Sequence, residues 1–140
     1  MSIEFNQWLE QNNLTEVFTT NAGDSLYVNK EKKYVVLKKQ GEYSTQAFYL
    51  NDIVEFNTYD DEKLVSNWIR GISGGTNTRS TSFSTNEVYM KIKLRNGLII
   101  RLQIFKACGR NIPRNSSAHI NLFMYACQIS QSIYDLATKL

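Results

Sequence analysis

The strongest structural signal in the chain lies in residues 87–104, which read EVYMKIKLRNGLIIRLQI. Apolar and polar residues alternate through both halves, as expected of two half-buried strands. The Asn-Gly dipeptide at 96–97 between them is a strong hairpin signal. A two-residue turn would pair Ile92 with Arg101 and place a charge on the apolar face. A three-residue turn over 95–97, with its glycine left-handed, places every apolar residue on one face, and we predict that register.

The polar face of this predicted hairpin carries most of its charge. The chosen register places Lys91 opposite Arg101, with Tyr89 and Lys93 beside them and Arg95 at the turn. Like charges directly opposite each other across strands are destabilising, so this pairing needs a reason. Two reasons stay open. The cations protect an exposed strand against pairing with another chain, or they meet an anionic partner such as a phosphate backbone, an acidic lipid surface or an acidic protein.

The segment before this hairpin predicts further antiparallel strands, so that strands fill residues 24–106. Apolar runs at 26–28 and 34–37 flank a polar turn and indicate a first hairpin. Its turn and flanks hold a second basic cluster: Lys30, Lys32, Lys33, Lys38 and Lys39. The sequence does not decide whether this cluster and the charged hairpin face form one surface or two.

A long loop is predicted at residues 71–86, where Gly, Ser, Thr and Asn predominate. Loops of this length inside one domain are uncommon and are either mobile or functional. Arg70 and Arg79 would give this loop long cationic side chains that could contact a partner, so we include both among the candidate partner-binding residues.

A helix is predicted at each end of the chain. Residues 1–15 predict a short one that ends near Asn12, and residues 116–140 predict a long one capped by Ser116 or Ser117. The apolar residues of the long helix recur at spacings of three and four: Leu122, Ala126, Ile129, Ile133, Leu136 and Leu140. This pattern is typical of packing across a sheet or of a coiled-coil seam, and we expect packing across the open end of the sheet.

The overall composition limits the protein further. Its 140 residues correspond to one domain, 1–140. Its net charge of +3 is smaller than the charge usual for a domain whose main role is to bind nucleic acid. Cys108 and Cys127 are too few for a disulfide framework and are expected as buried or half-buried thiols. Because neither a secretory signal nor a stretch of membrane-spanning length is evident, we expect a cytoplasmic protein, monomeric or homodimeric.

Three segments carry a resemblance to a known family. They are residues 48–56, FYLNDIVEF, residues 71–75, GISGG, and the 87–105 hairpin that leads into the C-terminal helix. In this order they resemble the pleckstrin-homology-like domains of uncharacterised bacterial and phage proteins. The resemblance covers about residues 24–140. It implies an α+β fold, an antiparallel, partly open, seven-stranded barrel capped by the C-terminal helix, and no established chemistry.

Candidate catalytic and metal-binding groups are few. The single histidine, His119, has near it in sequence only serines that capping already explains. Asp52 and the acidic run 60–62 lack the glycine and terminal glutamate of a calcium-binding loop, and the run predicts a solvated turn. The GISGG segment lacks the Lys-Ser/Thr ending of a phosphate-binding loop. We therefore expect no enzyme activity, no cofactor and no metal site.

Two classes of function remain. The first is a non-catalytic binding module that recognises a protein partner through its sheet face and the 71–86 loop. The second is an anion-binding domain for nucleic acid or phospholipid head groups, a specialised form of which would be a phage or mobile-element inhibitor of a nucleic-acid-processing complex. Steep salt dependence would mark the second class, because phosphate contacts release counterions.

Overall fold

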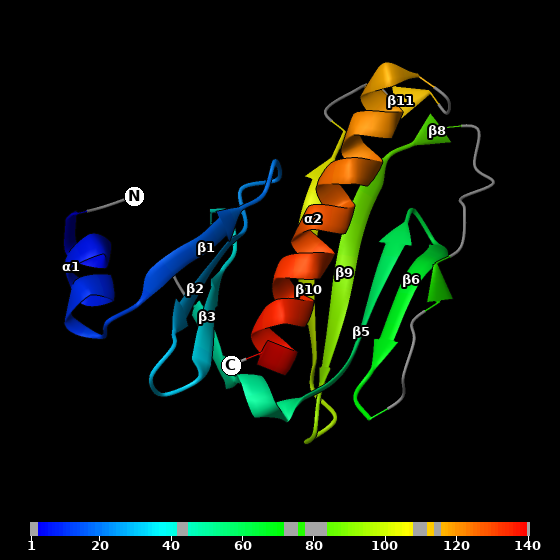
Figure 1. Ribbon diagram of the computed structural model, residues 1–140. Coiled ribbons are helices and arrows are strands. Elements are labelled where there is room, and N and C mark those ends of the chain that lie inside the picture. Colours follow the sequence, from blue (N-terminus) through cyan, green and yellow to red (C-terminus); the bar gives the residue numbers. More distant parts are fainter. Residues whose placement is uncertain are drawn as a thin grey trace.

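The computed structural model describes residues 3–41, 45–71, 76–77, 84–107, 112–113 and 116–139. The elements in chain order are α1 (Ile3–Gln11), β1 (Thr15–Thr19), β2 (Ser25–Asn29), β3 (Tyr34–Lys38), β4 (Thr45–Tyr49), the 3₁₀ helix η1 (Leu50–Asp52), β5 (Ile53–Asp60), β6 (Lys63–Ile69), β7 (Thr76–Asn77), β8 (Ser84–Thr85), β9 (Glu87–Leu94), β10 (Ile99–Lys106), β11 (Ile112–Pro113) and α2 (Ser117–Lys139). Figure 1 shows their arrangement, which confirms the predicted α+β class. No helix among the described residues is long and apolar enough to cross a membrane.

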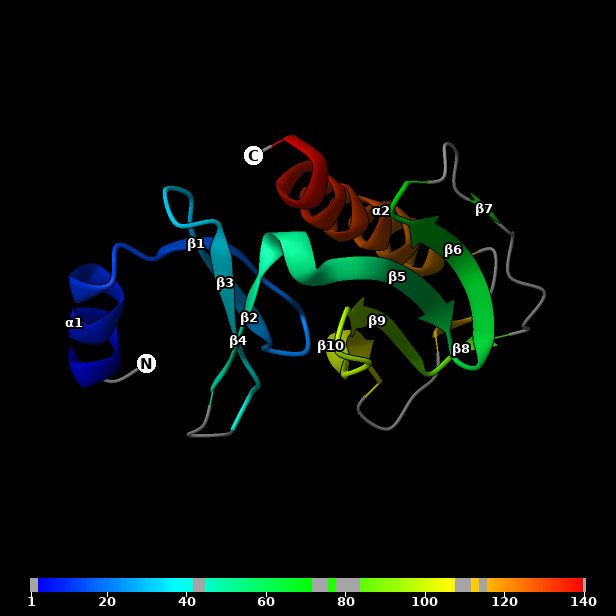
Figure 2. The ribbon, with the colours of Figure 1, turned by 90° about the horizontal axis from the view of Figure 1, so that it is seen from below.

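Two antiparallel sheets contain most of the strands. The first sheet has the order β1-β2-β3-β4 and the second has the order β10-β9-β5-β6-β7, while β8 and β11 form a short separate ribbon. Helix α2 lies between the two sheets in Figure 1, and in Figure 2 it lies along one side of the second sheet. The described strands do not close into a barrel, so the predicted pleckstrin-homology-like barrel is not confirmed.

The β9–β10 hairpin has the predicted register. Ile92 pairs with Ile100 and Met90 pairs with Leu102. Gly97 closes the turn with a left-handed φ of +88°, and its N–H donates to the Leu94 carbonyl over 2.9 Å. The even-numbered side chains of β9 and those of residues 100, 102 and 104 in β10 are therefore buried in the core. The alternation ends at a β-bulge between Gln103 and Phe105, beyond which Phe105 packs against the core and Lys106 is exposed.

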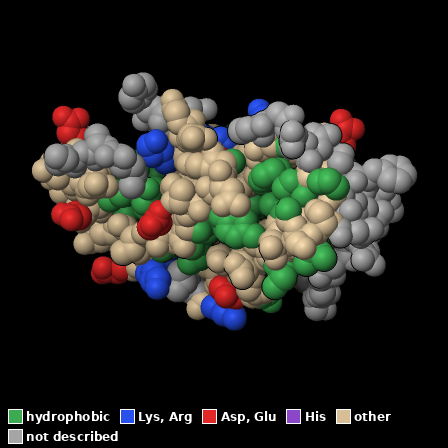
Figure 3. Space-filling view, turned by 90° about the horizontal axis from the view of Figure 1, so that it is seen from above, with side chains coloured by type: hydrophobic (Ala, Val, Ile, Leu, Met, Phe, Trp, Pro, Cys, Tyr) green, Lys and Arg blue, Asp and Glu red, His purple; other side chains and the backbone are tan. Residues whose placement is uncertain are grey.

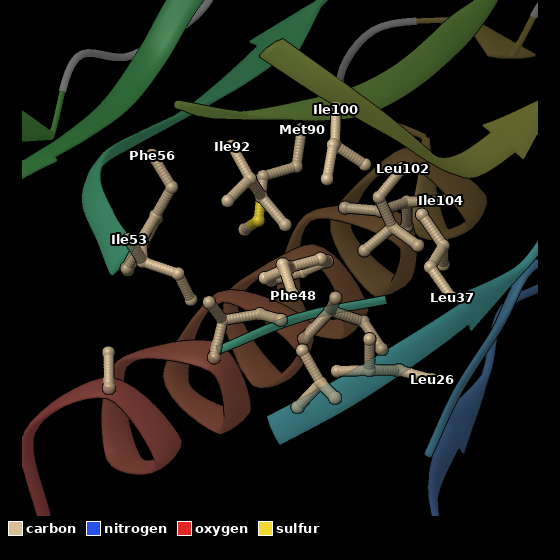
Figure 4. Close-up of a cluster of buried hydrophobic side chains, with 14 of the residues drawn as sticks. Leu26, Leu37, Phe48, Ile53, Phe56, Met90, Ile92, Ile100, Leu102 and Ile104 are labelled. Carbon is tan, nitrogen blue, oxygen red and sulfur yellow. The ribbon is translucent and has the colours of Figure 1, made fainter. Parts of the chain in front are cut away.

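The hydrophobic core lies between the two sheets and α2. In Figure 4, Phe48 of β4 lies near its centre, between Met90 and Ile92 of the second sheet and Leu26 of the first. Helix α2 contributes its buried stripe: Leu122, Ala126, Ile129, Ile133 and Ala137. The apolar stripe predicted for this helix therefore packs on the sheets, and the coiled-coil alternative does not apply to it. The Ser116 hydroxyl accepts a hydrogen bond from the His119 N–H over 3.1 Å and so caps the helix, as predicted.

Helix α1 covers the outer side of the first sheet. Its Leu9 packs with Leu14, Tyr27 and Val36 in a small cluster separate from the main core. The helix ends at Gln11, next to the stop predicted near Asn12 and inside the predicted segment 1–15, and the chain then enters β1.

Strand β1 was not predicted, because the expected strands began at residue 24. The sequence of β1 is TEVFT, and a β-bulge between Glu16 and Phe18 shifts its register against β2. A bulge adds one residue on one side of the ladder and interrupts the two-residue alternation. The periodicity that marks β9 and β10 is therefore missing from β1.

A buried carboxylate joins the two sheets. Asp24, at the end of the β1–β2 turn, is only 2 % exposed. Its carboxylate accepts hydrogen bonds from the Lys39 ammonium over 2.6 Å and the Gln103 N–H over 2.8 Å. Thr20 in the same turn donates its hydroxyl to the Gln103 carbonyl over 2.6 Å. We call these four residues, Thr20, Asp24, Lys39 and Gln103, the Asp24 corner.

The Asp24 corner also fixes the free edge of the second sheet. β10 is an edge strand of that sheet, and unpaired edge groups are otherwise available to other chains. At Gln103 both main-chain groups are taken by the corner, and the Lys39 ammonium also donates to the Arg101 carbonyl over 3.0 Å. The Tyr125 hydroxyl of α2 donates to the Thr19 carbonyl over 3.1 Å beside the corner. One turn of the first sheet thus anchors both β10 and α2.

Replacing Asp24 with alanine should destabilise the fold strongly. The substitution leaves the Gln103 N–H without its acceptor and the Lys39 ammonium without its opposite charge, and breaking a buried pair on one side costs about 3–5 kcal/mol. Urea denaturation followed by circular dichroism measures this free energy. The control is Asp135→Ala, which removes a carboxylate from an exposed ion pair with Lys139 and should leave the midpoint nearly unchanged. Equal midpoints for the two variants would contradict the role of the corner.

The left-handed turn makes a separate prediction at Gly97. A Cβ added there meets no atom within 4 Å, so the cost of Gly97→Ala is backbone strain alone, about 1–2 kcal/mol. Gly97→Asn should cost less, because asparagine tolerates positive φ better than alanine does. Urea titration of both variants checks the order, and an alanine variant as stable as the parent would show that the turn is not left-handed.

Candidate functional site

The outer face of the second sheet brings together the residues singled out from the sequence. Lys91 and Arg101 are direct register partners, as predicted, and Tyr89 lies one pair further along β9. Lys93 lies on the same face toward the turn and is exposed. The pairing of β9 with β5 adds Tyr59 directly opposite Tyr89.

The two opposed cations each lie over an aromatic ring. The Arg101 guanidinium lies 3.7 Å from the centre of the Tyr89 ring, and the Lys91 ammonium lies 5.4 Å from the centre of the Tyr59 ring. The rings of Tyr89 and Tyr59 are stacked, with centres 5.2 Å apart and planes at 16°. Each cation therefore faces the electron-rich face of a ring. We call Arg101, Tyr89, Tyr59 and Lys91 the cation–aromatic ladder.

Polar neighbours hold the ladder in place. Glu87 accepts a hydrogen bond from the Arg101 guanidinium over 3.0 Å and another from the Gln103 side-chain amide over 3.1 Å. The Arg101 Nε also donates to the Gln103 side-chain oxygen over 3.2 Å. Gln103 belongs to the Asp24 corner, so the ladder is connected to the junction of the two sheets. The like-charge repulsion expected from the sequence is offset by Glu87 and the two rings.

Burial changes the acidity of the central tyrosine. Removal of Tyr89 from water raises its pKa above the ordinary value, because burial disfavours the phenolate. The positive charge of Arg101 acts in the opposite direction and lowers the pKa, as the next largest effect. The Tyr89 phenol is thus neutral at physiological pH and keeps its hydroxyl as a hydrogen-bonding group.

The other predicted cations lie elsewhere. Arg95 at the hairpin turn donates from Nε to the Asn51 carbonyl over 3.1 Å. Arg70 donates to three main-chain carbonyls: those of Leu50, Ile53 and Ala137. Arg70 therefore ties η1 and the start of β5 to the end of α2 and is not brought to the ladder. Arg79 lies outside the described residues, as does most of the 71–86 loop.

The acidic run was predicted as a solvated turn, which is right for residues 61–62, where the chain turns and Glu62 is exposed, and wrong for Asp60. Asp60 is completely buried, and the His119 Nε2 lies 3.7 Å from its Oδ2. The Asp61 carboxylate accepts hydrogen bonds from the N–H groups of Asn86 and Glu87, each over 3.0 Å. Asp61 thus fixes the start of β9, although β9 begins about 25 positions later in the sequence.

His119 is enclosed beside Asp60 and has 11 % of its side chain exposed. This position favours a structural role over the catalytic one considered from the sequence. Among the described residues, no group of three or more His, Cys, Asp or Glu side chains could hold a metal ion.

One cavity opens away from the ladder. It has a volume of about 350 Å³ and lies between β1 and the C-terminal half of α2. The residues that line it are Thr15, Glu16, Val17, Val28, Lys30, Ser132, Asp135, Leu136 and Lys139. Two acidic and two basic side chains balance each other there, so the cavity favours a ligand of neither sign.

Sequence reasoning missed Tyr59 and Glu87 as members of the site. Each has an ordinary strand sequence around it. The role of Tyr59 depends on the pairing of β5 with β9, about 30 residues away, and the role of Glu87 depends on side-chain contacts with Arg101 and Gln103 of β10. No family model matches the sequence, and no curated protein or solved structure matches the chain.

The ladder predicts a measurable change in the ionisation of Tyr89. Arg101→Gln removes the nearby positive charge that lowers the pKa of Tyr89, so that pKa should rise further above its ordinary value. A titration of the tyrosine ring carbons by nuclear magnetic resonance measures it. Arg95→Gln, which changes a cation at the turn, should leave the Tyr89 pKa as it is. An unchanged Tyr89 titration in Arg101→Gln would show that the two groups are not in contact in solution.

Proposed function

We propose that this chain is a non-catalytic binding domain that recognises a protein partner through the outer face of its second sheet. The observation that carries the proposal is the cation–aromatic ladder. It places Arg101, Tyr89, Tyr59 and Lys91 in one ordered row on a sheet face. Tyrosine and arginine are enriched at protein interfaces and among the residues that contribute most to binding.

The order of the ladder lowers the cost of binding. Glu87 and Gln103 each accept one hydrogen bond from the Arg101 side chain, and a hydrogen bond between Gln103 and Glu87 holds these two acceptors together, which limits the freedom of Arg101 before a partner arrives. Immobilising a flexible side chain on association costs about 0.5–1.5 kcal/mol, and that cost is reduced when the side chain is already held.

The composition of the face favours a protein over a phosphate chain. At the turn end, Leu98 and Ile99 are 50 % and 55 % exposed beside the cation Lys93. Glu87 balances part of the positive charge at the other end, and Glu55 of β5 is the register partner of Lys93. This face has apolar, aromatic, basic and acidic groups. It is therefore complementary to a partner protein whose surface combines apolar groups with acidic ones.

The 71–86 loop belongs to the same proposal. Its residues 76–77 form β7, which extends the second sheet beyond β6 by pairing with Ser66 and Asn67. These two residues extend the sheet that bears the ladder at the edge opposite β10, and we include the 71–86 loop in the proposed binding surface.

The anion-binding alternative rests on Lys91, Lys93 and Arg101, which lie on one face. A phosphate ligand would compete with Glu87 for the Arg101 guanidinium, which makes this face a weaker choice for phosphate than for protein. The relationship to pleckstrin-homology-like domains also stays a proposal. Two antiparallel sheets and a C-terminal helix support it.

The double variant Lys91→Glu, Arg101→Glu tests the proposal. Both substitutions reverse charges on the ladder, so proteins captured from the native host by the parent should be lost from the variant. Captured proteins are identified and quantified by mass spectrometry, and circular dichroism confirms that the variant is folded. The matched control, Lys30→Glu with Lys32→Glu, reverses two exposed charges at the β2–β3 turn and should keep the same captured proteins.

Retention on heparin separates the two classes of function. A protein-binding face predicts weak retention that changes little between the parent and the ladder variant. Retention that falls steeply with salt and disappears in the ladder variant would favour the anion-binding alternative. Loss of the captured proteins from the control variant as well would contradict the placement of the binding surface on the second sheet.

A further inference from the structure

Helix α2 has a second stripe of residues on the side that faces away from the core. Its members follow one another at spacings of four and three: Ile120, Met124, Cys127, Gln131 and Tyr134. All five are exposed, and Ile120 and Met124 expose 54 % and 60 % of their surface. Figure 3 shows hydrophobic side chains gathered on the face seen from above, the side on which α2 begins. We call these five residues the outer stripe.

The outer stripe has the composition of an interface. From Ser117 to Tyr134 the helix contains no Lys, Arg, Asp or Glu. The solvent side of a surface helix usually carries charged residues, whereas the centres of interfaces are depleted in charge and enriched in Met and aromatic residues. The first charges after the stripe, Asp135 and Lys139, pair with each other over 3.0 Å. The uncharged part of the helix therefore ends at Tyr134, and the last turn of the helix, to Lys139, carries the charges.

We propose that the outer stripe packs against the same stripe of a second copy of this chain, with the two helices antiparallel. Cys127 is seven residues from both Ile120 and Tyr134, so a two-fold axis at Cys127 places Ile120 of one copy against Tyr134 of the other. The small Cys127 lies at the crossing point, where two helices approach most closely. Symmetric dimers use one self-complementary patch twice, and this spacing has that property.

The spacing also suits helix packing. Residues that alternate at four and three positions form the seam of helices that cross at about 20°. The outer stripe spans 14 residue steps, which is about 21 Å of helix. A contact confined to one helix face of this length is short for an interface that must bury ~1,200–2,000 Å² to be stable and specific. We therefore expect a weak dimer that forms as the concentration rises. This inference does not depend on the function proposed for the second sheet.

Sedimentation velocity of the full chain, from roughly 1 µM to 1 mM, tests the proposal. The sedimentation coefficient should increase with concentration toward that of a dimer. Met124→Lys places a charge inside the stripe and should weaken the dimer at least tenfold. Asn121→Lys adds the same charge on an exposed position of the same helix but outside the stripe, and its dissociation constant should match that of the parent.

Oxidative cross-linking tests the register. In a Cys108→Ser background, Cys127 is the single thiol, and mild oxidation should produce a disulfide-linked dimer on a non-reducing gel. Disulfides form only when the two Cα atoms lie within about 7 Å, so the product requires Cys127 at the crossing. A monomer at every concentration, a dimer that persists in Met124→Lys, or a dimer without this cross-link would each overturn the proposal. Binding of the monomer to neutral lipid vesicles through this face would overturn it as well.

Discussion

The arrangement of the two sheets depends on the buried carboxylate of Asp24. This group receives hydrogen bonds from the end of β3 through Lys39 and from the middle of β10 through Gln103. A buried carboxylate is costly unless it is fully paired, so each partner must be present for the corner to be stable. The corner is therefore specific: it accepts one alignment of the first sheet against the edge of the second. Hydrophobic packing fills the space between the sheets, but apolar contacts alone tolerate small shifts between layers.

The same corner links the core to the outer face. Gln103 donates its main-chain N–H to Asp24 and uses its side chain to hold both Arg101 and Glu87. The order of the cation–aromatic ladder thus derives from the junction of the sheets as well as from the strands themselves. Lys91 and Arg101 would repel each other on an isolated hairpin, and in the folded chain each faces a tyrosine ring contributed by the next strand along.

Local sequence patterns predicted the local structure well. The alternation around Gly97 was sufficient to identify the bulged register, because a charged residue on the apolar face excluded the other choice. The capping serine and the buried stripe of α2 followed from their spacing in the same way. What escaped prediction depends on distant partners. Asp24 meets Gln103 across 79 positions, and nothing around Asp24 in the sequence marks it as buried.

The environment of single side chains was predicted less well. Asp60 was expected in a solvated turn, but it is buried because α2 begins next to it and brings His119 within 3.7 Å. Cys127 was expected as a buried or half-buried thiol, but it is exposed because the core side of α2 is already filled by residues such as Ala126 and Ile129. Helix periodicity predicts that one side of the helix is buried, but it does not decide whether a small residue outside the main apolar stripe, such as Cys127, lies on the buried side or on the exposed side.

The alternation of β9, and of β10 up to its bulge after Gln103, has a consequence for how this protein can change during evolution. Adjacent residues in these strands serve two different surfaces, the core and the outer face. Substitutions at odd positions can therefore remodel the face without disturbing the core. A single residue inserted or deleted in the regular part of either strand, before the bulge of β10, would exchange the two sets of side chains, exposing the core residues and burying the charged ones. We expect natural variants of this hairpin to differ in the identity of their odd-numbered residues and to keep its length constant.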